Sequence, residues 1–295
     1  MDQPTIGFIG QGFIGKSYAD DFERRGFTVI RYALEEPYIQ NKDRIKECDI
    51  VFIAVPTPTT PEGYDDSIVR GVASLARNGA TIVIKSTMLP GTTESIQKEH
   101  PGKIVMHSPE FLRVTTAGED AAHPDRNIIG ITEKSETHEK AASQVMNLLP
   151  SAPYKIICTA REAEDIKYAG NLFLYMKVMF ANLLYDFAHK EGCDYDVIKN
   201  TVAADPRIGA SHLDVTHASG HVGSKTGRGA GGLCFIKDIA AFREMYEKVV
   251  PEDTAGARVL RALECKNVNL LMESGKDVDL LKGVYGDDPK SVCAS

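Results

Sequence analysis

The stretch TIGFIGQGFIG, residues 5–15, decides the fold of the N-terminal half of the chain. Its apolar start, TIGFI, has the composition of a short buried strand, and the residues after it open a segment with helical spacing. Between them, Gly10, Gly12 and Gly15 form a G-x-G-x-x-G pattern. In a strand–turn–helix unit such glycines permit a tight turn and the close approach of a pyrophosphate to the helix N-terminus. The stretch therefore predicts a dinucleotide-binding βαβ unit.

Further strands and helices alternate along the first half of the chain. Apolar runs bounded by turn residues predict strands, and the segments between them show helical periodicity. This alternation predicts right-handed βαβ units, and hence an α/β fold with a Rossmann-like, doubly wound parallel sheet over residues 1–157. The predicted strands are FTVIRY at 27–32, DIVFIAV at 49–55, ATIVIKST at 80–87, KIVMHSP at 103–109 and RNIIGIT at 126–132.

The second half of the chain has a helical texture. A helical period without proline runs on from about residue 160, with Thr159 placed to cap it and Gly192 placed to end it. Such a length exceeds that of an average helix and predicts a long connecting helix. The segments after it are also helical in pattern, so we expect a mainly helical second domain over 158–278 and a tail over 279–295.

Composition excludes several classes of protein. The chain has 295 residues and a net charge of -7, which gives no general attraction to nucleic acid or to an anionic membrane. No apolar run is long enough to cross a membrane, and the N-terminus has no basic segment typical of a signal peptide, so we expect a cytoplasmic protein. The six cysteines form no C-x-x-C pair and predict reduced thiols, with neither a disulfide framework nor a metal site.

One element of the dinucleotide pattern is missing. The second strand should end in an acidic residue that binds the adenosine ribose, but Arg31 and Tyr32 stand there, and Glu35 and Glu36 follow slightly late. An arginine at this position can accommodate a 2′-phosphate or can simply be a solvated charge. We therefore expect NAD and keep NADP as an alternative.

Eight segments in order resemble the UDP-glucose 6-dehydrogenase family and, more broadly, the nucleotide-sugar dehydrogenases. The similarity extends from about residue 5 to about residue 275. The segments are GQGFIG, FIAVPTPTT, IKSTMLPGTT, SPEFLR, PDRNIIG, IKYAGNLFLYMKV, DPRIG and GGLCFIKD.

This resemblance implies a four-electron oxidation of a sugar primary alcohol to a carboxylate, with two NAD used in succession, and a homodimer. UDP-glucose is the expected substrate and UDP-glucuronate the product. The chemistry requires a nucleophile, and Cys234 in GGLC is the candidate. A thiolate adds to the intermediate aldehyde, and the resulting thiohemiacetal is oxidised to a thioester. The alternative is that Cys234 is a small buried apolar side chain.

The resemblance also assigns roles to other residues. Lys167 and Asn171 share a helix face at i and i+4 and can stabilise an oxyanion. Asp238 is expected to act as a base through a bound water, although it also suits a first-turn partner of the helix dipole. Glu110 is expected to activate the water that hydrolyses the thioester, and Thr87 to hold a catalytic water.

The predicted binding residues form two sets. The cofactor set is Gly10, Gly12, Phe13, Ile14, Gly15, Arg31, Val55, Pro56, Thr57 and Thr87. The substrate set is Glu110, Phe111, Leu112, Arg113, Lys167, Asn171, Arg207, Gly231 and Lys237, with Arg207 expected to reach the site of a partner subunit.

Three departures from the family pattern qualify these expectations. The sequence holds no second Rossmann-like domain that would help to bind UDP, so a dimer partner supplies those contacts, the affinity is weak, or the substrate is smaller. The loop between DPRIG and GGLC is enlarged and rich in histidine, lysine and arginine, which we interpret as a compensating phosphate-binding surface. Val114 replaces the second glutamate of the PEFLxE pattern.

Other functions therefore stay open at this stage. They are a dehydrogenase of GDP-mannose or a UDP-N-acetyl sugar, a two-electron hydroxyacid dehydrogenase that would not need Cys234, and a cofactor-binding protein without turnover.

Overall fold

The computed structural model describes residues 3–294, and their contacts divide the chain into two compact units. Unit 1 holds the residues up to Thr57 together with Asp65–Lys167. Unit 2 holds Pro58–Tyr64 together with the residues from Tyr168 onward.

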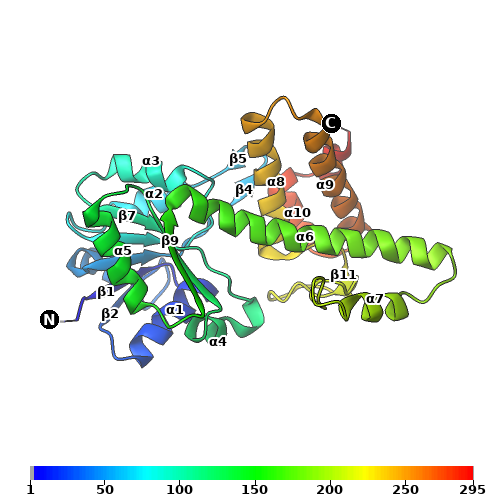
Figure 1. The fold of residues 1–295 in the computed structure, drawn as a ribbon. Coiled ribbons are helices and arrows are strands. Elements are labelled where there is room, and N and C mark those ends of the chain that lie inside the picture. The colour runs from blue at the N-terminus through cyan, green and yellow to red at the C-terminus, as the bar shows by residue number, and fades with distance from the viewer. Residues whose placement is uncertain (1–2, 295) are drawn as a thin grey trace. The chain divides into compact units, whose positions relative to one another are not determined.

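Unit 1 is built on a seven-stranded sheet with the order β2-β1-β3-β6-β7-β8-β9 (Figure 1). The chain passes from one side of β1 to the other after β2, which creates the switch point at which α/β sheets bind ligands. The α/β prediction is confirmed. The strands are β1 (Ile6–Ile9), β2 (Val29–Tyr32), β3 (Ile50–Ile53), β6 (Thr81–Ile84), β7 (Ile104–His107), β8 (Arg126–Ile131) and β9 (Tyr154–Thr159).

Helices cover both faces of this sheet, so its inner strands are largely apolar, and β1 and β3 carry no polar side chain. In β3, Ile50 and Phe52 pack in the core under α1 and α5, whereas Val51 and Ile53 pack in the core under α2 and α3. Successive side chains of a strand point to opposite faces, which explains this division. The helices are α1 (Phe13–Arg24), α2 (Ser67–Ala73), α3 (Thr92–Glu99), α4 (Ala117–Ala122) and α5 (Glu136–Leu148), with η1 (Ile39–Glu47) and η2 (Val114–Thr116).

The sheet is mostly parallel, as predicted, but its last two strands run opposite to the other five. β7 pairs with β8 in antiparallel fashion, and β9 runs parallel to β8. A parallel crossover needs a helix that carries the chain back to the amino edge of the sheet. The only α-helix in the β7–β8 connection is α4, whose six residues rise about 9 Å. The chain therefore re-enters the sheet from its carboxyl edge.

The long helix α6 (Ala160–Lys190) lies where the sequence predicts it. At its start, Thr159 and Glu162 form a capping box in which the Thr159 amide donates to Glu162 Oε2 at 2.8 Å and the Glu162 amide donates to Thr159 Oγ1 at 3.3 Å. Beyond its end, Gly192 takes a left-handed φ of 74° that ends the helix. The predicted cap and stop are thus confirmed.

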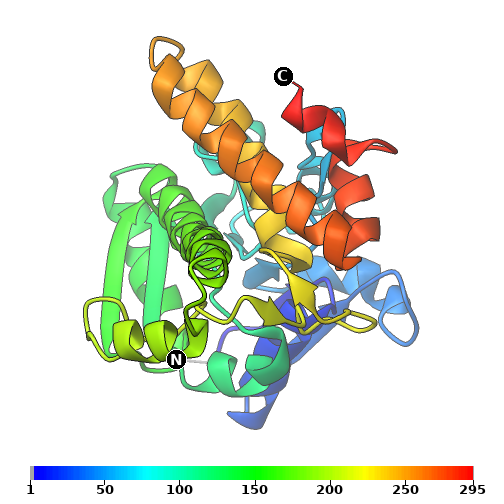
Figure 2. The same ribbon diagram turned by 90° about the vertical axis from the view of Figure 1, so that its right-hand side faces the viewer.

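Unit 2 is mainly helical, as expected, and α8 and α9 lie side by side in it (Figures 1 and 2). Leu270 on α9 and Ile239 on α8 share one core with Tyr175 on α6. The elements are β4 (Thr59–Thr60), β5 (Gly63–Tyr64), α7 (Tyr195–Ala203), β10 (Thr216–His217), β11 (Gly227–Arg228), α8 (Gly232–Val249), α9 (Thr254–Ser274), α10 (Val278–Tyr285) and η3 (Pro289–Cys293).

The segment from residue 279, expected as a tail, is folded as far as the structure describes it. Leu281 and Val284 of α10 are buried in a core with Ile236 of α8 and Leu271 of α9. The apolar pattern of this short segment provides the physical reason, because Leu281 and Val284 lie one helical turn apart and share a face.

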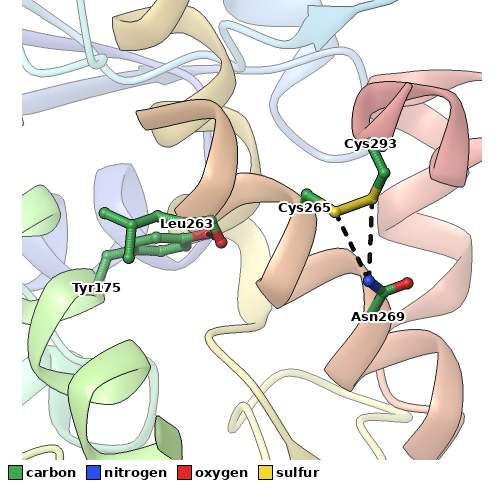
Figure 3. Close-up of a disulfide and its surroundings, with 5 residues drawn as sticks. All are labelled: Tyr175, Leu263, Cys265, Asn269 and Cys293. Carbon is green, nitrogen blue, oxygen red and sulfur yellow. Dashed lines mark hydrogen bonds between the residues drawn. A yellow bond between two sulfur atoms is a disulfide. The ribbon is translucent and has the colours of Figure 1, made fainter. Parts of the chain in front are cut away.

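A disulfide joins Cys265 of α9 to Cys293 of η3, so the expectation of reduced thiols is wrong for this pair (Figure 3). The Asn269 amide lies 3.6 Å from Cys265 Sγ and 3.9 Å from Cys293 Sγ. The two cysteines are 28 residues apart in segments that pack against each other. No local pattern in the sequence predicts this pairing. Cys234 is not part of the bridge.

Within residues 3–294, no helix combines the length and apolarity that crossing a membrane requires.

Candidate active site

The glycine-rich turn after β1 is shaped by contacts with its own backbone. Gly10 has a φ of 91°, and a Cβ there would lie 2.3 Å from the Ala54 carbonyl oxygen. A Cβ at Gly15 would lie 2.0 Å from the Gly10 carbonyl oxygen. A Cβ at Gly12 would meet nothing within 4 Å, so the space beside the first turn of α1 is open. The turn thus has the tight and the open glycine positions that a pyrophosphate-binding turn requires.

Arg31, at the end of β2, is already neutralised by side chains of α1. Its guanidinium donates to both Glu23 carboxylate oxygens at 2.9 and 2.7 Å and lies 2.7 Å from Asp20 Oδ1. Burial opposes the charge of Arg31, but the hydrogen bonds with Glu23 and Asp20 outweigh it and raise its pKa. An arginine held between two carboxylates is poorly suited to receive a 2′-phosphate.

The residues that follow β3 and β6 meet at the carboxyl ends of these strands. The Val55 amide donates to Ser86 Oγ at 3.0 Å, and Ser86 Oγ donates to the Val55 carbonyl at 2.7 Å. Thr57 Oγ1 donates to the Thr87 carbonyl at 2.8 Å. The structure therefore brings the Val55–Thr57 segment and Thr87, both predicted at the cofactor site, into direct contact.

Glu110 and Lys167 form a buried ion pair in unit 1. Lys167 Nζ donates to Glu110 Oε1 and to the Glu110 carbonyl oxygen, each at 2.7 Å, and the side chains are 5% and 4% exposed. The Leu112 amide donates to Glu110 Oε2 at 2.8 Å. Phe111 lies with its ring centroid 3.7 Å from the Arg126 guanidinium carbon and 5.6 Å from Lys167 Nζ. Both oxygens of the predicted base are thus engaged by donors.

Lys85 is a buried charged residue that the sequence analysis did not select. Its Nζ donates to Ser108 Oγ at 2.9 Å and lies 4.4 Å from the centre of the Tyr18 ring. Burial lowers the pKa of Lys85 to about 7, against an opposing effect of Glu110. Burial, with Lys85 and Lys167 adding to it, likewise lowers the pKa of His107 to about 3. The only sequence signal was a lysine at the end of an otherwise apolar strand.

Two arginines of the substrate set point to solvent. Arg113 is 75% exposed and pairs with Asp120 at 2.5 Å, while Arg207 is 87% exposed and pairs with Asp205 at 2.6 Å. Neither donates a side-chain hydrogen bond to another predicted site residue among those described.

The first turns of α8 carry Cys234, Lys237 and Asp238. Because Cys234 and Asp238 are four residues apart in one helix, they lie on the same face. Asp238 is 1% exposed and accepts from Asn171 Nδ2 and from Lys237 Nζ, each at 2.6 Å. The structure therefore brings Asn171 to the helix of the predicted nucleophile.

The enlarged loop before α8 is held by internal contacts. Arg228 donates to Asn182 Oδ1 at 2.9 Å and pairs with Asp186 at 2.6 Å. His217 Nε2 lies 3.0 Å from the ammonium of Lys276, which can only donate, so His217 is neutral there. Arg228 and His217 are thus occupied by partners of their own chain, contrary to the phosphate-binding interpretation of the loop for these two residues.

Among residues 3–294, no group of three or more histidine, cysteine, aspartate or glutamate side chains is arranged to hold a metal ion.

Two successive segments of the chain match two domains of one protein family. Residues 38–148 match the NAD-binding domain of the UDP-glucose/GDP-mannose dehydrogenase family, and residues 161–268 match its central domain.

Individual relatives agree with this match. The chain is 33% identical to a UDP-glucose 6-dehydrogenase of Rhizobium meliloti (strain 1021) over 68% of the chain and 46% of that relative. It is 34% identical to the UDP-glucose 6-dehydrogenase YwqF of Bacillus subtilis (strain 168) over 70% of the chain and 46% of that relative. The chain thus aligns with less than half the length of these curated relatives.

Solved structures of other proteins have a fold similar to that of this chain. A UDP-glucose dehydrogenase from Pyrobaculum islandicum matches with a TM-score of 0.74 and 28% identity, over 92% of this chain and 71% of that one. A UDP-D-ManNAc dehydrogenase from Pyrococcus horikoshii matches with a TM-score of 0.74 and 20% identity, over 91% and 70% of the two chains, which shows the shared fold alone.

Proposed function

Since the chain belongs to the UDP-glucose/GDP-mannose dehydrogenase family, we propose that it oxidises UDP-glucose to UDP-glucuronate with NAD in a four-electron reaction through Cys234. The observation that carries the proposal is the first two turns of α8, where Cys234 shares a helix face with Asp238 and Asp238 is bonded to Asn171 and Lys237. A two-electron hydroxyacid dehydrogenase has no use for this cysteine.

The glycine turn fits a dinucleotide, and the pairing of Arg31 favours NAD over NADP. The open space at Gly12 leaves room for a pyrophosphate, and the first turn of α1 holds no acidic residue that would repel it. Residues Gly10–Gly15 and Val55–Thr57 would hold the cofactor. When bound, it accepts a hydride from the oxidised carbon. Arg31 is engaged by Asp20 and Glu23 and offers little attraction to a 2′-phosphate.

Cys234 is the proposed nucleophile. Its thiolate adds to the carbonyl carbon of the aldehyde, the sulfur–carbon bond forms, and the former carbonyl oxygen takes a proton to give a thiohemiacetal. Removal of a hydride from the carbon and of the proton from the hydroxyl group of that adduct gives a thioester. Asn171 and Lys237 are the proposed donors to the oxygen on which negative charge develops, and Asp238 holds both of them in place.

Glu110 is the proposed base of the hydrolytic step, and Thr87 the residue that holds the attacking water. Water adds to the thioester carbon, the carbon–sulfur bond breaks, and the carboxylate leaves as the thiolate is restored. Lys167 keeps the Glu110 carboxylate oriented through its hydrogen bond of 2.7 Å to Oε1.

A homodimer is part of this proposal. α6 exposes a row of large apolar side chains spaced three and four residues apart, the spacing of a helix–helix seam. Exposed apolar patches of this kind mark interaction surfaces. The row comprises Phe173 (66% exposed), Met176 (49%), Phe180 (62%), Leu183 (50%) and Phe187 (65%). Arg207 is 87% exposed, which suits the expectation that it serves a partner subunit.

The substrate is tested with a panel of nucleotide sugars and NAD. UDP-glucose, GDP-mannose and a UDP-N-acetyl sugar are incubated separately, and each product is analysed by mass spectrometry for conversion of the primary alcohol to a carboxylate. UDP-glucose is expected to give the highest kcat/KM, in agreement with the names of two relatives that exceed 30% identity. A carboxylate formed only from another sugar would overturn the substrate, and no product from any of them would overturn the activity.

A further inference from the structure

The backbone that leads into α8 is joined by hydrogen bonds to the C-terminal part of α9 and to the residues that follow it. The Arg228 amide donates to Ser274 Oγ at 3.1 Å, and the Gly229 carbonyl accepts from Lys276 Nζ at 3.0 Å. The last contact joins the Gly232 amide to Asp277 Oδ2 at 2.7 Å. Asn267 also takes part, because its side chain pairs with both the amide and the carbonyl of Ala230 at 2.7 and 2.9 Å.

Asp277 lies beside the first turn of α8, where it accepts the hydrogen bond from the Gly232 amide. Its side chain is 1% exposed, and Oδ2 accepts from Ser219 Oγ at 2.5 Å as well as from Gly232. Oδ1 has no hydrogen-bond partner among the described residues, and His221 Nε2 lies 3.6 Å from it. A buried carboxylate with an unsatisfied oxygen is costly and needs an explanation.

Two further features of the backbone accommodate the Asp277 carboxylate. Asp277 has a φ of 53°, a left-handed conformation that is uncommon outside glycine and that aspartate tolerates better than most residues. Gly231 makes room for it, since a Cβ at Gly231 would lie 2.1 Å from Asp277 Oδ2. One of the two glycines of GGLC is thus explained by a residue of the same chain rather than by a ligand.

We propose that Asp277 is a positioning residue for Cys234: it fixes the start of α8 through the Gly232 amide, and its negative charge holds back ionisation of the thiol. This inference rests on the proposed role of Cys234. The N-terminal end of a helix favours a nearby anion, which would promote the thiolate two residues further on. A carboxylate bonded to the first amide of the helix offsets that attraction.

Other charged and titratable side chains lie around Asp277 and on the first turns of α8. Lys276 carries the opposite charge but donates to Gly229 and faces the neutral His217. On α8 itself, Lys237 is paired with Asp238. The other titratable groups of the loop near this end are His221, which faces Oδ1, and His212, which packs against the Phe235 ring.

The test measures the ionisation of Cys234 directly and does not depend on turnover. Iodoacetamide alkylation of the Cys234 peptide is followed by mass spectrometry from pH 6 to 10 in the full chain, with the exposed Cys193 as an internal reference thiol. In Asp277→Asn the shape of the residue is kept and the charge is removed. We expect the midpoint of Cys234 alkylation to move to lower pH by about half a unit while Cys193 is unchanged.

Two further variants keep the test decisive. Gly231→Ala places a methyl group where the carboxylate lies, displaces it, and is expected to shift the Cys234 midpoint in the same direction. Asp279→Asn removes an exposed charge from the first turn of α10 and is expected to leave the midpoint unchanged. A midpoint that is the same in the wild type, Asp277→Asn and Gly231→Ala would overturn the inference. Failure of the proposed activity would show instead as a wild-type chain whose thiol ionises but forms no product.

Discussion

Lys167 donates from Nζ to two oxygens of Glu110, the main-chain carbonyl and the side-chain Oε1, each at 2.7 Å. Both side chains are almost completely buried. The pair therefore joins the start of α6 to the SPEF segment after β7, and it combines two residues that the family resemblance assigns to separate roles. A base that is already bound to an ammonium is held in a fixed orientation.

Removing one partner of this pair should destabilise the fold strongly. In Lys167→Met the buried carboxylate of Glu110 loses its charged partner, and we expect the free energy of unfolding to fall by about 3–5 kcal/mol. Urea unfolding measures this change. In Lys140→Met, which breaks an exposed pair with Glu136, the expected change is below about 1 kcal/mol. Equal effects of the two substitutions would contradict the account.

Cofactor preference should respond to the partners of Arg31. In the double variant Asp20→Asn, Glu23→Gln the guanidinium is released, and we expect kcat/KM for NADP to rise by about tenfold relative to NAD, since a hydrogen bond between charged groups contributes about 1.5–3 kcal/mol. Steady-state kinetics with both cofactors provides the measurement. Asp43→Asn, which removes an exposed charge from η1, should leave the ratio unchanged. A double variant with the wild-type ratio would rule out this control of specificity.

The apolar row on α6 should determine the oligomeric state. We expect a dimer in size-exclusion chromatography with light scattering, and a monomer for Phe180→Glu, Phe187→Glu, because buried carboxylates at a helix seam are costly. Val249→Glu serves as a control, since Val249 is 71% exposed at the end of α8. The row has another role if the double variant remains a dimer or if the wild type is a monomer.

The disulfide should stabilise unit 2. Cys265 and Cys293 are 28 residues apart, and closing a loop of that length is expected to contribute about 3–4 kcal/mol to the free energy of unfolding. We therefore expect Cys293→Ser to unfold at lower denaturant concentration, whereas Cys193→Ser, at an exposed cysteine outside the bridge, should not. Mass spectrometry after alkylation under denaturing conditions counts the thiols. A wild-type chain in which all six cysteines are alkylated without reduction would contradict the bridge.

Features with a local cause were predictable from the sequence. A Cβ at Gly15 would meet the Gly10 carbonyl, five residues away, and the capping box at Thr159 and Glu162 lies within four residues. The positions of six strands of the seven-stranded sheet follow from short apolar runs, whereas β9 was not predicted. Such patterns can be recognised in a sequence because the interacting residues are separated by only a few positions.

Features that join distant segments were not predictable. Cys265 and Cys293 meet because α9 and η3 pack together, and Asp277 meets Gly232 across 45 residues. The direction of β8 depends on how far a six-residue helix can carry the chain. The burial of Lys85 could not be predicted from a single lysine at a strand end. Periodicity indicates which face of an element a side chain occupies, but it does not indicate how deeply that side chain is buried.

The central claim is a four-electron oxidation that passes through Cys234, and counting NADH tests it most directly. Purified protein is given limiting UDP-glucose and excess NAD, and the absorbance of NADH is read at completion for the wild type and for Cys234→Ala. The account predicts about two NADH per UDP-glucose for the wild type and no such yield without the thiol. One NADH per UDP-glucose, or two in both proteins, would contradict it.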